Sequence, residues 1–115
     1  ANEAEATSQV EKMMTALAQN RISDAEKLMH PQASEKSGAA MTQMSDFLAG
    51  RAAEAMELRN INIKTSTGTS GKIRQEEVAY QVTLTDGAVI YLNVVYLSNH
   101  AGTGFSSFQL VLGVV

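Results

Sequence analysis

Four side chains in the second half of the chain carry the groups that proton-transfer chemistry requires: Glu76, Tyr80, Tyr91 and Asn93. A carboxylate can abstract a proton, phenol hydroxyls can donate hydrogen bonds, and an amide both donates and accepts them. On one sheet face they would line a pocket for a small ligand. A structural role for Asn93 is the favoured interpretation, because its expected neighbours are apolar and the Tyr80 hydroxyl could satisfy its amide.

The two histidines do not suggest a metal site. His30 precedes Pro31, where a helix is expected to end and where a cationic ring would interact favourably with the helix dipole. His100 lies in a glycine-rich segment without an acidic neighbour in sequence. Metal sites normally need three or four ligands, and the chain has no cysteine. We therefore predict no metal, no cofactor and no thiol chemistry.

The segment Gln109-Leu110-Val111-Leu112-Gly113 matches the Gln-x-Val-x-Gly pattern that cystatins use against papain-like proteases. Cystatins present this pattern on an exposed hairpin turn, whereas here it lies within the last expected strand. A cystatin-type inhibitor is thus an unfavoured alternative, and we expect the segment to be inert toward cysteine proteases.

Length and composition indicate one domain over residues 1–115. The chain is 44% hydrophobic and 18% charged with a net charge of −3, which is ordinary for a globular protein. Its nine basic residues are scattered, which argues against a nucleic-acid surface. No apolar stretch is long enough to predict a membrane span. The start at Ala1, followed by a polar, alanine-rich run, resembles a chain trimmed by signal peptidase, so we expect a periplasmic or secreted protein.

Periodicity predicts helices first and strands afterwards. Apolar spacing and capping residues predict helices over 3–19, 24–29 and 35–49, with Gly50 as a left-handed cap. Alternating segments bounded by turn residues predict strands over 56–66, 73–85, 88–98 and 105–115.

The Asp86-Gly87 pair predicts a two-residue hairpin turn, in which Thr85 faces Ala88 and both central residues have positive φ. Side chains alternate along strands, so this turn assigns faces. The helix-facing side would then carry Leu84, Val82, Tyr80, Val78, Val89, Tyr91, Asn93 and Val95. The opposite, outer side would carry an apolar set that we predict as an interface for self-association: Ile90, Leu92, Val94, Tyr96 and Val111.

These elements predict an α+β fold, with N-terminal helices packed on one face of a curved four-stranded antiparallel meander sheet. With its short second helix in the stretch from Ile22 to Pro31, this order of elements resembles the nuclear-transport-factor-2-like superfamily, a cystatin-like cone. The resemblance implies a ligand space between sheet and helices, and the superfamily contains isomerases, cyclases and dehydratases as well as non-enzymatic binding domains.

The fold alone does not select a function. We favour a non-enzymatic binding or assembly domain that acts through its outer sheet face, as a homodimer or as an adaptor for a protein partner. The alternative is an isomerase or hydrolase that holds a small apolar ligand in the concave pocket.

Overall fold

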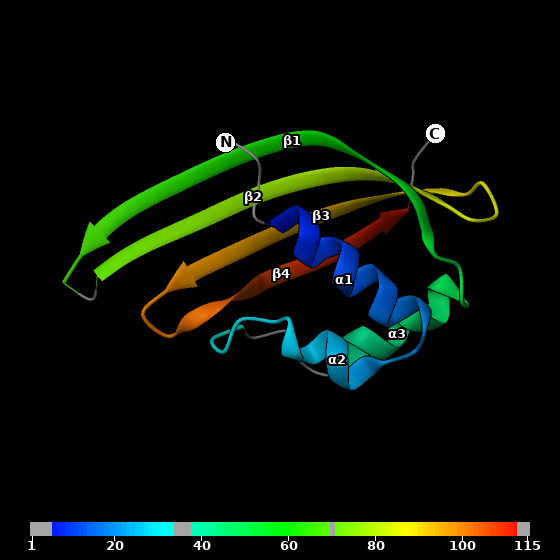
Figure 1. The fold of residues 1–115 in the computed structure, drawn as a ribbon, viewed down its shortest axis with the longest axis horizontal. Helices are drawn as coiled ribbons and strands as arrows, with labels where there is room; N and C mark the ends of the chain where they lie inside the picture. Colours follow the sequence, from blue (N-terminus) through cyan, green and yellow to red (C-terminus); the bar gives the residue numbers. More distant parts are fainter. Residues whose placement is uncertain (1–5, 34–37, 70, 113–115) are drawn as a thin grey trace.

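The computed structural model describes residues 6–33, 38–69 and 71–112. Within them, three helices precede four strands: α1 (Ala6–Ala18), α2 (Ile22–Lys27), α3 (Gly38–Leu48), β1 (Ala53–Gly68), β2 (Gly71–Leu84), β3 (Val89–Asn99) and β4 (Gly102–Leu112). The strands form one antiparallel sheet in the order β1-β2-β3-β4. The sheet is long and curved, and all three helices lie on one side of it (Figure 1). The predicted α+β fold is confirmed, with element ends shifted by a few residues.

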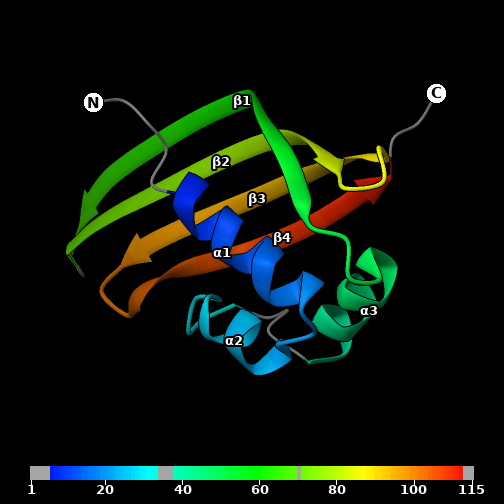
Figure 2. The same cartoon turned by 45° about the vertical axis from the view of Figure 1, so that its right-hand side comes forward.

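The helix α1 lies along the sheet, and α2 and α3 lie near the C-terminal end of α1 (Figure 2). The buried side chains of α1 include Val10, Met13, Met14 and Leu17, which recur at the three- and four-residue spacing of one helical face. The helix α3 ends in a left-handed turn, since Ala49 has φ 50° and Gly50 has φ 82°. Gly50 thus adopts the conformation expected of a helix cap.

The hairpin between β2 and β3 differs from the predicted one. The N–H of Leu84 donates to the carbonyl of Ala88 at 2.8 Å, and the N–H of Gly87 donates to the carbonyl of Leu84 at 2.9 Å. The loop therefore has three residues, 85–87, and only Gly87 in it has positive φ, at 90°. This is the arrangement of a type I turn followed by a glycine bulge. The prediction of a two-residue turn is wrong.

One extra loop residue exchanges the two faces of β3, because side chains alternate along a strand. The observed pairs are Val82 with Ile90, Tyr80 with Leu92, Val78 with Val94 and Glu76 with Tyr96. All of these side chains are buried on the helix-facing side, which we call the inner face. The predicted interface is therefore wrong for four of its residues, which belong to the core: Ile90, Leu92, Val94 and Tyr96. Val111 is exposed on the outer face, as predicted.

The space between sheet and helices is filled by side chains. They include four methionines and two phenylalanines: Met13, Met14, Met29, Met41, Phe105 and Phe108. The ring of Phe105 contacts Tyr96 and Phe108 edge to face, with centroids 5.0 and 5.3 Å apart. Such close-packed contacts stabilise the core beyond simple burial.

The chain after α2 crosses the edge of β4 at Gly104. The N–H of Phe105 donates to the carbonyl of Leu28 at 3.0 Å, and the N–H of His30 donates to the carbonyl of Phe105 at 2.8 Å. A Cβ on residue 104 would lie 2.6 Å from the His30 nitrogen and 2.7 Å from the Met29 carbonyl carbon. Glycine is therefore required at this crossing.

His30 is completely buried behind this crossing. Its Nδ1 accepts the N–H of Gln32 at 2.9 Å, so the ring hydrogen lies on Nε2, which donates to Asn99 Oδ1 at 3.0 Å and approaches the Gly102 carbonyl at 3.2 Å. His30 thus joins the segment after α2 to the β3–β4 hairpin. The predicted role as a cation beside the helix dipole is wrong.

Candidate functional site

The structure separates the four residues of the predicted pocket. Glu76 and Tyr80 lie on the inner face, each only 1% exposed. Asn93 pairs with Ala79 and Tyr91 pairs with Gln81, so both point to the outer face, where both are exposed. The pocket prediction required all four on one face, and the register excludes that arrangement.

Glu76 fixes the first turn of α1 to the sheet. Its Oε1 accepts the N–H of Ala6 at 3.2 Å, and its Oε2 lies 3.4 Å from the Nη2 of Arg74. The first N–H groups of a helix lack partners within the helix, and a carboxylate there also interacts favourably with the dipole. Glu76 is therefore a structural anchor, and its burial leaves no approach for a substrate.

Tyr80 forms a second anchor beside it. Its hydroxyl lies 2.8 Å from Thr7 Oγ1, in the first turn of α1. Burial raises the pKa of Tyr80 above its ordinary value. The hydrogen bond to Thr7 lowers it by less than burial raises it, and the charges of Glu76 and Glu11 raise it further. The phenol therefore stays protonated at neutral pH and holds α1 against β2.

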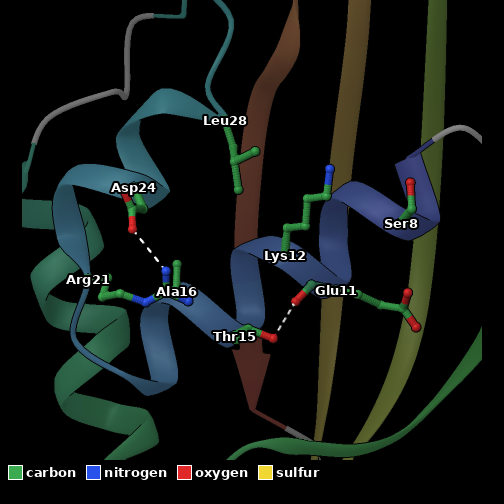
Figure 3. Close-up of a pocket in the computed structure, with 8 residues that line it drawn as sticks. All are labelled: Ser8, Glu11, Lys12, Thr15, Ala16, Arg21, Asp24 and Leu28. Carbon is green, nitrogen blue, oxygen red and sulfur yellow. Dashed lines mark hydrogen bonds and ion pairs between the residues drawn. The ribbon is translucent and has the colours of Figure 1, made fainter.

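A groove of about 500 Å³ lies between α1 and α2 (Figure 3). Its lining residues are Ser8, Glu11, Lys12, Thr15, Ala16, Arg21, Asp24 and Leu28. Arg21 and Asp24 pair with each other at 3.0 Å, and Thr15 Oγ1 donates to the backbone carbonyl of Glu11 at 2.9 Å. Most of these side chains are exposed. Because its polar side chains do not converge on one point, we assign no chemistry to this groove.

The outer sheet face offers a more ordered set of side chains. Val89, Tyr91 and Val111 are large apolar side chains exposed on this face, and we call them the outer apolar patch. Tyr91 pairs directly with Val111 across β3 and β4, and Val89 lies two residues before Tyr91. Directly paired residues on one face have Cβ atoms about 5 Å apart, so the patch is continuous.

A row of amide side chains borders the outer apolar patch. The cross-strand row contains Asn60, Ala79, Asn93 and Gln109 on successive strands, from β1 to β4. A hollow of about 290 Å³ lies over this row, and its lining includes all four of these residues. The amides of Asn60, Asn93 and Gln109 present donors and acceptors beside an aromatic ring and two valines. This combination suits recognition of a protein surface, where tyrosine is enriched.

Two of these residues were not predicted as interface residues: Asn60, and Gln109, whose side chain is expected from the strand alternation to point outward. Val89 was predicted on the helix-facing side, and that prediction is wrong. The pattern of β2 indicates the correct face of β3. Thr83, Gln81 and Glu77 are polar residues on one face of β2, and a register that places Asn93 on this same face keeps the polar side chains together.

The remaining sequence motifs do not build a site. Within residues 6–33, 38–69 and 71–112, no group of three or more His, Asp or Glu side chains is placed to hold a metal ion. The described part of the cystatin-like segment, Gln109 to Leu112, lies inside β4 and not on a turn, while Gly113 lies outside the described residues. None of the described helices is both long and apolar enough to cross a membrane.

Comparison of the chain with protein-family models, curated proteins and solved structures gives no match. The resemblance to the nuclear-transport-factor-2-like superfamily stays a prediction, as does export of the protein.

Proposed function

We propose that this chain is a small non-enzymatic binding or assembly domain that engages a protein partner through the outer face of its sheet. The observation that carries the proposal is the outer apolar patch. Its three side chains are exposed together on a face that the described helices leave open, because all of them pack on the opposite side (Figure 1). Monomeric proteins more often expose large apolar side chains singly, and clustered ones mark interaction surfaces.

The helix-facing side supports binding over small-molecule catalysis. Met13, Met14 and Phe105 fill the space where a substrate pocket would lie. The polar groups facing that space, Glu76 and Tyr80, are occupied by the first turn of α1. These contacts leave the outer face as the better surface for recognition.

An adaptor role is the better form of this proposal. Four of the predicted interface residues lie in the core, so the exposed apolar surface is smaller than the one predicted for the homodimer. Tyr91 provides one aromatic anchor at 37% exposure, with the amide row beside it. A central aromatic residue with a polar border is typical of the few residues that dominate protein interfaces.

A photo-crosslinking amino acid at position 91 should therefore capture a partner in cells, whereas the same amino acid at exposed position 43 on α3 should not.

The captured protein is then purified and titrated against the domain. We expect Tyr91→Glu to weaken binding at least tenfold, which corresponds to about 1.4 kcal/mol, and Gln43→Glu to leave it unchanged. Equal capture at both positions, or unchanged binding by Tyr91→Glu, would contradict the proposal.

A further inference from the structure

The edge strand β1 carries apolar side chains that the helices do not cover. Within the described residues its only sheet neighbour is β2, so its other edge has no strand partner. Leu58 and Ile63 pair with the buried Tyr80 and Glu76, which places both on the inner face. They are nevertheless 48% and 38% exposed. The strand runs along the margin of the sheet, beyond the helix layer (Figure 2).

A bulge at Arg59 sets which side chains share a face along β1. Leu58 pairs with Tyr80 and Asn60 with Ala79, so Arg59 is the extra residue between them. Glu57 before the bulge and Lys64 after it consequently both lie on the outer side, because they pair with the outer residues Gln81 and Gln75. A bulge normally discourages pairing at a sheet edge, as does an exposed lysine.

We propose that β1 nevertheless pairs antiparallel with β1 of a second copy, about a two-fold axis at Ile61. This inference goes beyond the proposed function, because it uses a different surface from the outer apolar patch. Ile61 would face its own counterpart, and Asn60 would face the second copy's Asn62. With the bulge at Arg59 skipped in each strand, Leu58 then faces the second copy's Ile63, and Glu57 faces the second copy's Lys64.

This register is complementary in both shape and charge. On the inner face, Leu58 of each copy packs against Ile63 of the other copy, so the two-fold axis produces this apolar contact twice. On the outer side, two carboxylate–ammonium pairs form between Glu57 and Lys64. In the single chain Glu57 contacts Arg59 at 3.2 Å and Lys64 contacts Glu77 at 3.4 Å, both in solvent-exposed pairs that contribute little and exchange readily.

The backbone supplies the rest of the interaction. An antiparallel pair of edge strands satisfies N–H and C=O groups that otherwise face water, and a two-fold axis repeats each contact. Both copies keep their helices on the same side, since the axis is perpendicular to the sheet. The dimer would have one continuous sheet of eight strands, with the outer apolar patches of both copies still accessible.

Disulfide trapping tests this register directly, because the natural chain has no cysteine. Directly opposite residues in an antiparallel pair have Cα atoms about 4.5 to 5.5 Å apart, within the range that a disulfide spans. Ile61→Cys should therefore form a covalent dimer under mild oxidation at low protein concentration. Ile63→Cys is the matched control on the same face: its counterpart lies four pair steps away, roughly 14 Å, so it should stay monomeric. The double variant Leu58→Cys, Ile63→Cys should again be trapped.

Charge reversal separates the pairing from general effects on folding. Sedimentation equilibrium should show that Lys64→Glu and Glu57→Lys each raise the dissociation constant of the dimer at least tenfold. The variant that combines both changes should recover the original dissociation constant. Tyr91→Glu should leave the dimer unchanged, which distinguishes this proposal from the outer-face proposal. The inference is overturned if the unmodified chain is monomeric at all concentrations, if Ile63→Cys is trapped as readily as Ile61→Cys, or if the combined reversal does not restore association.

Discussion

Replacement of Leu92 by glutamate is expected to abolish cooperative folding, whereas the same replacement at the neighbouring Asn93 should be tolerated. Leu92 is completely buried on the inner face, between Tyr80 and Leu110 in the adjacent strands. A carboxylate there would be buried without a cationic partner, which costs roughly 3 to 5 kcal/mol in comparable cases, in addition to the lost apolar packing. Small domains are stable by only about 5 to 15 kcal/mol.

Asn93→Glu is the matched control, because it introduces the same charge one residue along the same strand. Asn93 is exposed on the outer face, so we expect its free energy of unfolding to change by no more than about 1 kcal/mol. Urea unfolding followed by circular dichroism measures both variants. A folded Leu92→Glu protein together with an unfolded Asn93→Glu protein would show that Asn93 lies on the inner face of β3 and Leu92 on the outer face.

Gly104→Ala is expected to lower the free energy of unfolding by about 3 kcal/mol, at the upper end of the usual cost of overpacking. The added methyl group would meet backbone atoms of Met29 and His30 at less than 3 Å, and a backbone cannot rotate away as a side chain can. Relief would require the crossing segment to move from β4. That movement would stretch the hydrogen bonds of Phe105 to Leu28 and to His30.

The matched control is Gly68→Ala at the end of β1, where an added Cβ has no atom within 4 Å and the backbone φ is not left-handed. Chemical denaturation should show no loss of stability for this variant. Equal stability of the two variants would mean that the segment after α2 does not cross β4 as closely as the structure places it.

Much of the architecture could be predicted from the sequence because it depends on local patterns. The apolar spacing of α1 defines that helix regardless of what it packs against. The alternation in β2 likewise defined its inner face, with Val78, Tyr80 and Val82 buried as expected. Element order and the side of the sheet that the helices cover follow from these patterns.

The face assignment of β3 failed because it rested on one turn. Asp86-Gly87 is compatible both with a two-residue turn and with a three-residue loop that ends in a glycine bulge, and these differ by one residue in register. The strand itself is apolar at nearly every position, so its own pattern is weak. Asn93 was the decisive residue: a register that buries Leu92 and exposes Asn93 leaves no amide in the core.

The long-range contacts were beyond prediction for a different reason. The link from Glu76 to Ala6 joins residues 70 positions apart, and the link from His30 to Asn99 joins residues 69 positions apart. Each depends on how α1 and the segment after α2 cross the sheet, which no local pattern encodes. The bulge at Arg59 is similar, because it becomes visible only in the pairing of β1 with β2.

Nitration of the native protein tests most directly the central claim, that Tyr91 lies on an open outer face while the opposite face is a closed core. The chain has three tyrosines, and the structure leaves Tyr91 37% exposed, Tyr96 9% and Tyr80 1%. Nitration proceeds through the phenolate, so the raised pKa of Tyr80 protects that residue further. Peptide mass spectrometry after brief treatment at low protein concentration should find the modification at Tyr91 alone. Modification of Tyr96 or Tyr80 with Tyr91 protected would contradict the assignment of the two faces.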